Sequence, residues 1–138
     1  MNKKFAQFTL KNIIDLGKHI MTPLELKDYI DFEVKRVYFI TQPKGKTGAH
    51  CHKIEEELFI LIQGKCVASI DKGNGLEEIP MEGPKTAIYL PAYVWHSFKD
   101  LTPDAVLLAL SSTNYSAKRD DYIEDYEEFK KVRSQLCA

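Results

Sequence analysis

Short apolar runs separated by glycine- and proline-containing turns dominate this 138-residue chain. One run carries two histidines near residue 50, and Gly73-Asn74-Gly75 predicts a hairpin turn. We expect further strands over residues 32–40, 57–63, 66–71, 86–90, 95–98 and 105–111. Many short strands at close spacing predict an all-β fold, either a β-sandwich or a jelly roll.

The C-terminal stretch changes to a helical pattern. Between about residues 120 and 134, apolar side chains recur every three or four positions and give one apolar face, formed by Tyr122, Ile123, Tyr126, Phe129 and Val132. Acidic residues crowd the start of this stretch and basic residues its end, an order that complements the helix dipole. The sequence therefore predicts a C-terminal α-helix that packs across the sheets or onto a second subunit.

Length and composition fit one small domain, which we expect to span residues 1–138. The net charge of −1 gives no electrostatic case for binding nucleic acid or anionic lipid. No apolar segment follows the N-terminal lysines, and no run approaches the length of a membrane span. The three cysteines are odd in number and unrelated in spacing, which favours reduced thiols, so we expect a cytoplasmic protein.

Two histidines separated by one cysteine, His50-Cys51-His52, are the strongest indication of function. Residues two apart on a strand point to the same side, so both imidazoles should face one pocket. Cys51 should point the opposite way, as a buried thiol. Paired imidazoles can bind a metal ion or move protons near neutral pH.

The spacing around this pair reproduces the first signature of the cupin superfamily. His50-x-His52 is followed by Glu57 and then by Gly64. The resemblance implies a double-stranded β-helix, or jelly roll, whose two motifs bring four side chains into the mouth of one barrel. The fold class we expect is therefore all-β and cupin-type, with a C-terminal α-helix.

The second cupin signature is looser. Gly83 and Pro91 precede His96, as the pattern requires. Tyr93, however, stands where cupins usually have glycine, and Asp100 replaces the usual asparagine. His96 still lies about forty residues after the first motif, which fits a second strand beside it.

A closer resemblance covers nearly the whole chain in order. The segments KRVYFI at 35–40, GAHCHK at 48–53, PAYVWH at 91–96 and DYIEDYEEF at 121–129 are similar to those of WxcM/FdtA-type sugar-nucleotide 3,4-ketoisomerases. Membership implies a homodimer that acts on a dTDP-linked 4-keto-6-deoxyhexose, dTDP-4-keto-6-deoxyglucose, without metal or other cofactor. Such enzymes move the ketone from C4 to C3, on routes to 3-amino-3,6-dideoxy sugars of lipopolysaccharide or S-layer glycans.

The residue types suit this chemistry. Shifting a ketone to the neighbouring carbon requires removal of the C3 proton, an enediolate, and protonation at C4; a histidine can serve as base and then acid. We assign His50 as the principal base and acid, and His52 as the second proton carrier or orienting group. Tyr38 would donate to the sugar oxygens.

Four residues are predicted to bind substrate. Arg36 shares a strand face with Tyr38 and could reach phosphate, while Trp95 and His96 would close the pocket wall. Members of the family usually carry arginine where this chain has Thr47, with Lys46 one step earlier. Lysine can neutralise a diphosphate, but it lacks the bidentate fork of arginine.

Glu57 keeps a different function open, because relatives often have glutamine at this position. With glutamate, the chain has the full three-histidine, one-glutamate cupin ligand set of His50, His52, Glu57 and His96. Such a set suits divalent iron, manganese, nickel or zinc. The alternatives are therefore a metal-dependent cupin enzyme, either an oxygenase or an isomerase, and a non-catalytic sugar-nucleotide-binding cupin.

Overall fold

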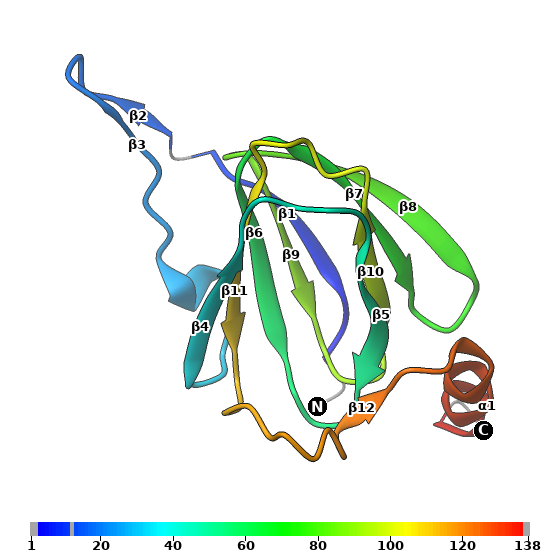
Figure 1. Cartoon of the computed structure of the whole chain (residues 1–138). Coiled ribbons are helices and arrows are strands. Elements are labelled where there is room, and N and C mark those ends of the chain that lie inside the picture. Colours follow the sequence, from blue (N-terminus) through cyan, green and yellow to red (C-terminus); the bar gives the residue numbers. More distant parts are fainter. Residues whose placement is uncertain (1–2, 12, 137–138) are drawn as a thin grey trace.

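The computed structural model describes residues 3–11 and 13–136, so Cys137 lies outside the described residues. Two five-stranded antiparallel sheets face each other, a small hairpin extends away from them, and a helix lies at the C-terminal end (Figure 1). The predicted all-β architecture with a C-terminal helix is confirmed. Within the described ranges, no helix is both long and apolar enough to cross a membrane.

The strand order places segments distant in sequence side by side. The first sheet runs β1 (Ala6–Thr9), β9 (Thr86–Leu90), β6 (Glu57–Gln63), β11 (Val106–Ser111) and β4 (Arg36–Ile40). The second runs β12 (Tyr122–Ile123), β5 (Thr47–His52), β10 (Trp95–Lys99), β7 (Lys65–Asp71) and β8 (Leu76–Glu82). Outside these sheets lie β2 (Ile14–Asp15), β3 (Ile20–Met21), the 3-10 turn η1 (Leu26–Asp28) and α1 (Tyr126–Leu136).

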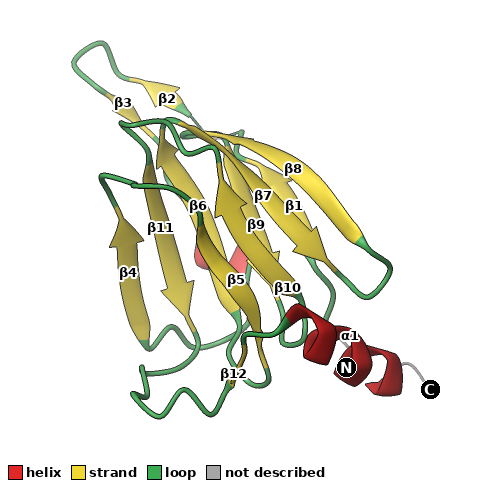
Figure 2. Ribbon diagram, turned by 45° about the vertical axis from the view of Figure 1, so that its right-hand side comes forward, coloured by secondary structure: helices red, strands yellow, loops and turns green. Residues whose placement is uncertain are grey.

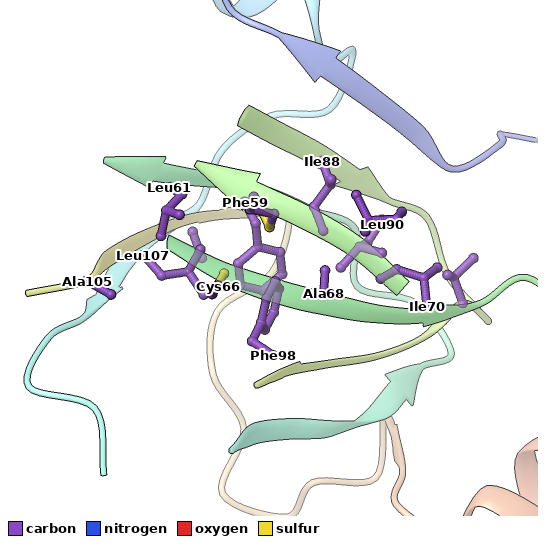
Figure 3. Packing of buried hydrophobic residues seen from close by; sticks show 14 residues of the cluster. Phe59, Leu61, Cys66, Ala68, Ile70, Ile88, Leu90, Phe98, Ala105 and Leu107 are labelled. Atoms are coloured by element: carbon purple, nitrogen blue, oxygen red, sulfur yellow. The ribbon is translucent and has the colours of Figure 1, made fainter. Parts of the chain in front are cut away.

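The main core fills the space between the two sheets. Alternate side chains of β6, among them Phe59 and Leu61, meet Ala68 and Ile70 of β7 and Phe98 of β10 (Figure 3). The other face of β6 is buried as well, in a second cluster beneath the segment 24–34. Burial on both faces explains why the sequence of β6 is continuously apolar rather than alternating.

The strand expected over residues 32–40 is shorter in the structure. Hydrogen bonding to β11 starts where the Lys35 amide donates to the Ser111 carbonyl, and β4 proper spans Arg36–Ile40. Phe32 and Val34 instead pack into the second cluster on the outer face of the first sheet. The alternation predicted the face of Arg36, but it extended the strand too far toward the N-terminus.

The helix expected from about residue 120 begins later, at Tyr126 (Figure 2). Tyr122 and Ile123 form β12, which pairs with His52 and Cys51 of β5. The Asp125 side chain accepts a hydrogen bond from the Glu128 amide at 3.0 Å and so caps the helix N-terminus. The prediction that the helix starts at about residue 120 was therefore wrong, because the residues expected to form its first turn pair with β5 as a strand.

Candidate active site

A cavity of about 240 Å³ lies between the two sheets. Strand β4 contributes Arg36 and Tyr38, and the opposite wall holds three histidines from β5 and β10. The remaining lining residues are Ile40, Thr47, Gly48, Phe59, Phe98, Tyr115 and Tyr122. The structure thus brings most of the predicted site residues into one pocket.

The three histidines form a compact cluster. The His50 ring centroid is 4.8 Å from those of both His52 and His96, and the centroids of His52 and His96 are 5.7 Å apart. His96 comes from β10, where it lies opposite His50 in the strand pairing. Cys51 points away from this cluster and is fully buried beside Ile123. The predicted sidedness of this strand is confirmed.

Glu57 lies beneath the histidines and is 1% exposed. Its Oε2 accepts a hydrogen bond from the Tyr38 hydroxyl at 2.5 Å, while Oε1 lies 3.2 Å from His52 Nε2 and 3.7 Å from His96 Nε2. Burial alone would raise the pKa of Glu57, but His52, His96 and Tyr38 together hold that pKa at about 2. Glu57 is therefore an anion at neutral pH.

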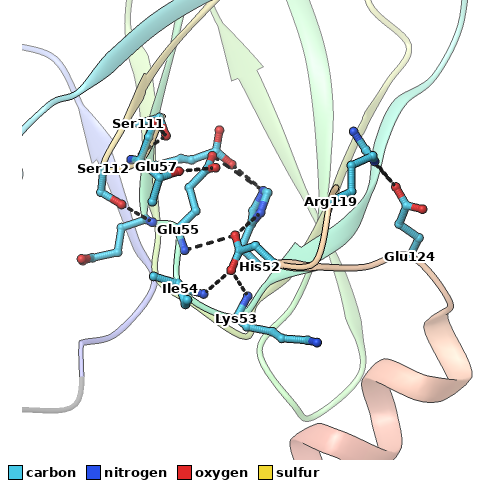
Figure 4. Close-up of polar contacts among 12 residues, drawn as sticks. His52, Lys53, Ile54, Glu55, Glu57, Ser111, Ser112, Arg119 and Glu124 are labelled. Atoms are coloured by element: carbon cyan, nitrogen blue, oxygen red, sulfur yellow. Dashed lines mark hydrogen bonds and ion pairs between the residues drawn. The ribbon is translucent and has the colours of Figure 1, made fainter. Parts of the chain in front are cut away.

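His52 lies between carboxylates on both ring nitrogens (Figure 4). Its Nδ1 is 3.0 Å from Asp121 Oδ2, and its Nε2 faces Glu57. Burial alone would lower the pKa of His52, but Glu57, Glu55 and Asp121 outweigh burial and raise that pKa. The surroundings therefore favour the imidazolium form of His52.

The other two histidines are held neutral. Burial, assisted by the neighbouring His96 and His52, lowers the pKa of His50 to about 3. Burial and the charge of His52 lower the pKa of His96 to about 4, against the opposing effect of Glu57. His96 Nδ1 lies 3.1 Å from the Val94 carbonyl, so it carries the ring hydrogen in the neutral form. The pocket thus combines a neutral base with a nearby cation.

Arg36 lines the pocket, as predicted, but it is already paired. Its guanidinium donates to Glu55 at 3.1 Å and lies 5.2 Å from the centre of the Tyr38 ring. Lys46 is exposed beside Thr47 and is not among the residues that line the cavity. Any contact between Lys46 and a substrate would therefore be made at the rim.

Trp95 does not line the pocket, so the prediction that it closes the pocket wall was wrong. Neighbouring residues on a strand point to opposite faces, and His96 takes the inward position on β10. Trp95 packs outward against α1, with ring centroids 5.2 Å from Tyr126 and 5.6 Å from Phe129. Its role is to attach the C-terminal helix to the second sheet.

Sequence reasoning missed the contribution of the segment before α1. The Tyr122 ring lies 4.9 Å from that of His50 and 4.5 Å from that of His52, while Tyr115 lines the same pocket. Asp121, beside Tyr122, contacts His52 from behind. The family-like segment 121–129 was the available signal, but its helical periodicity concealed the pocket residues.

The donor set also fits a divalent cation. Nitrogen atoms of His50, His52 and His96 lie within 4.8 Å of one another. Glu57 Oε1 is buried and accepts no well-aligned hydrogen bond from the described residues, as a vacant ligand atom would. Three imidazoles and one carboxylate could hold such a metal, which would act as a Lewis acid on a carbonyl oxygen.

A family model and a known relative match nearly the whole chain. The family model described as "FdtA: WxcM-like, C-terminal" matches residues 1–134. The chain is 35% identical to a TDP-4-oxo-6-deoxy-alpha-D-glucose-3,4-oxoisomerase of Aneurinibacillus thermoaerophilus, over 99% of this chain and 96% of that one.

Two solved structures show the same fold. The sugar 3,4-ketoisomerase QdtA of Thermoanaerobacterium thermosaccharolyticum, in complex with TDP, superposes with a TM-score of 0.85 at 28% identity, over all of both chains. A 3,4-ketoisomerase of Helicobacter canadensis gives 0.83 at 27% identity, over 96% of this chain and 99% of that one. These matches confirm the predicted cupin-type jelly roll. The chain belongs to the FdtA family of WxcM-like proteins.

Proposed function

We propose that this protein is a sugar-nucleotide 3,4-ketoisomerase that converts dTDP-4-keto-6-deoxy-D-glucose to a dTDP-3-keto-6-deoxyhexose. The observation that carries the proposal is the pairing of His50 and His52 in one pocket, with ring centroids 4.8 Å apart, where burial lowers the pKa of His50 and neighbouring carboxylates raise the pKa of His52. A relative that is 28% identical, a histidine-to-asparagine variant of QdtA, was crystallised in complex with TDP-4-keto-6-deoxyglucose. The A. thermoaerophilus relative is named for the same reaction.

The reaction is a proton transfer between adjacent carbons. His50 Nε2 or Nδ1 takes the C3 proton, and the C–H electron pair forms the C3–C4 double bond of an enolate with the charge on O4. The O3 proton passes to O4, and His50 returns its proton to C4, leaving the ketone at C3. His52 stabilises the oxyanion or carries the second proton, because it lies beside the base and its carboxylate neighbours raise its pKa.

Tyr38 and the pocket wall position the sugar in this proposal. The Tyr38 hydroxyl now donates to Glu57, so its oxygen can accept from a sugar hydroxyl, or it can rotate and donate. His96 forms the wall, and Arg36 can exchange its contact with Glu55 for the substrate diphosphate. Lys46 would meet the diphosphate only at the rim.

Incubation with dTDP-4-keto-6-deoxyglucose in D2O tests the function directly. We expect a new ketosugar with deuterium at C3 or C4, observed by NMR; the absence of both would reject the ketoisomerase. His50→Asn should abolish the exchange while preserving the circular dichroism spectrum. His19→Asn, which changes an exposed histidine in the same way, is the matched control. Normal turnover by the His50 variant would show that His50 is not the base.

We propose further that the enzyme needs no metal ion. The competing function is a metal-dependent cupin enzyme that uses His50, His52, Glu57 and His96. The observation that favours it is Glu57 Oε1, which is buried and accepts no well-aligned hydrogen bond from the described residues. Elemental analysis of protein purified without chelator separates the two. Stoichiometric metal that can be removed only with loss of turnover would overturn the metal-free proposal. Binding of the dTDP-sugar without turnover would instead indicate a non-catalytic module.

The proposal includes the oligomeric state and the cellular role of the protein. We infer that one domain, residues 1–138, forms a homodimer in the cytoplasm and supplies a ketosugar for the synthesis of deoxyamino sugars of a surface glycan. Exposed apolar side chains support a protein interface: Phe39 on edge strand β4 is 65% exposed, and Ile20 on the β2–β3 hairpin is 64% exposed. Light scattering should give twice the mass of 15.8 kDa, and a monomeric mass would overturn the dimer.

A further inference from the structure

Asp121 contacts the active site without lining its cavity. It precedes β12, whose pairing with β5 places Tyr122 opposite His52. The Asp121 carboxylate contacts His52, with Oδ2 3.0 Å from Nδ1, and Asp121 is not among the residues that line the cavity. The sequence motifs that indicate the catalytic histidines assign no role to Asp121, yet it is the partner of one of these histidines.

Backbone contacts fix the position of this carboxylate. Asp121 Oδ1 accepts hydrogen bonds from the amides of Ile54 at 2.6 Å and Lys53 at 3.1 Å, and Oδ2 lies 3.4 Å from the Glu55 amide. The Lys53 amide also donates to the Asp121 carbonyl at 2.8 Å. One side chain therefore holds both the turn after β5 and the ring of His52.

The contact also determines where the His52 hydrogens lie. A carboxylate only accepts hydrogen bonds, so the ring nitrogen beside Asp121 must be the donor. With a hydrogen fixed on Nδ1, the other nitrogen, Nε2, is turned toward Glu57, 3.2 Å from its Oε1. Loss of this contact would free the ring to rotate or to lose the hydrogen from Nδ1.

We propose that Asp121 is a positioning residue that fixes the ring of His52 and keeps a hydrogen on its Nδ1, so that Nε2 serves the sugar pocket. The proposal rests on the ketoisomerase function proposed above. Asp121 reaches the sugar pocket through His52, because it does not itself line the cavity that would hold the sugar. An orienting carboxylate of this kind is worth about 10⁴-fold in kcat in serine proteases.

Asp121→Asn tests the proposal with little change in shape. The single amide oxygen can still accept from the Ile54 and Lys53 amides, but the NH2 group then faces His52 Nδ1 and donates to it. We expect kcat to fall by about 100-fold or more while KM changes by less than about threefold. Asp120→Asn, an exposed neighbour changed in the same way, should keep wild-type kcat.

Nitrogen-15 NMR of labelled histidine gives a readout that does not depend on turnover. We expect His52 Nδ1 to be protonated in the wild type and unprotonated in Asp121→Asn. A wild-type ring protonated only at Nε2 would overturn the proposal, even if the variant failed to fold. A kcat within threefold of wild type in the folded variant, or equal losses in both aspartate variants, would overturn it as well. Wild-type protein without turnover would instead refute the ketoisomerase function.

Discussion

Acid should destabilise this protein through His50, whose replacement by asparagine should reduce the effect. Burial, with His96 and His52 nearby, lowers the pKa of His50 to about 3 in the folded protein, from 6.5 for an ordinary histidine. Between these values the unfolded chain binds a proton that the folded chain does not. The stability that depends on neutral His50 is therefore complete above pH 6.5 and is lost as the pH falls toward 3.

The size of the effect follows from the same shift. One pH unit between the two pKa values changes the free energy of unfolding by about 1.4 kcal/mol. Lowering the pH from 7 to 5 covers about 1.5 units below the unfolded pKa, so His50 accounts for a loss of at most about 2 kcal/mol. Between pH 7 and pH 5, the loss of stability should be smaller in His50→Asn than in the wild type, by at most about 2 kcal/mol.

Urea unfolding at pH 7 and pH 5 measures this difference. The comparison needs the wild type, His50→Asn and His19→Asn, because the last variant removes an exposed histidine. We expect a smaller loss of stability between pH 7 and pH 5 only in the His50 variant. An equal loss of stability in all three proteins would show that the folded state does not hold His50 neutral.

Four further substitutions test the packing and the site. Gly64→Ala would place a Cβ against the Thr102 side-chain oxygen and 2.8 Å from Ala105 Cα at φ +85°, whereas Gly75→Ala meets nothing within 4 Å at φ +104°. Thermal melts should show a loss of stability of about 3 kcal/mol for Gly64→Ala and about 1 kcal/mol for Gly75→Ala. Equal losses would exclude the clash as the cause. Phe129→Ala, at a side chain 1% exposed, should cost about 3–4 kcal/mol in urea unfolding, and a loss below 1 kcal/mol would show that α1 does not depend on this ring. Tyr38→Phe removes the hydroxyl that donates to Glu57 and should lower kcat by about 10- to 100-fold in the D2O assay; an unchanged kcat would remove Tyr38 from the catalytic residues.

Burial determined how well the sequence predicted the strands. The bounds predicted for β6 and β9 agree with the structure, because both strands are buried over most of their length and read as compact apolar runs. Strand β8, the partner of β7 across the predicted Gly73–Gly75 turn, was not assigned. It has exposed glutamates and Pro80, which an edge strand accepts, so it lacks the apolar pattern.

The site was predictable where period-two geometry applied. That geometry placed His50 with His52, and Arg36 with Tyr38, on pocket-facing sides of their strands. The same alternation places Trp95 on the face opposite to His96 and so outside the pocket. Trp95 was predicted to line the pocket because it is next to His96 in the sequence. The sequence did not predict Tyr122 as a pocket residue, because the apolar residues around it recur every three or four positions, as in a helix. Only the long-range pairing of this segment with β5 makes it a strand.

The departures from the second cupin signature have a backbone explanation. Tyr93 adopts a φ of +62° and Asp100 a φ of +53°, in the left-handed region that glycine and asparagine occupy most easily. The cupin preference at these two positions therefore reflects conformation rather than chemistry. Tyr93 still donates its amide to the His52 carbonyl at 2.7 Å, so the turn is retained with a different residue.

The identity of the cation beside Glu57 depends on a single nitrogen atom. Glu57 is a buried anion, and a buried anion requires a positive partner. In a metal-dependent enzyme that partner would be an ion bound by His52 Nε2, whereas in the metal-free enzyme it is the proton on the same nitrogen. Because Nε2 cannot carry both, the two functions exclude each other in one molecule. Asp121 supports either form, since its contact is with Nδ1, so Glu57 and the pocket side of His52 decide between proton transfer and metal chemistry.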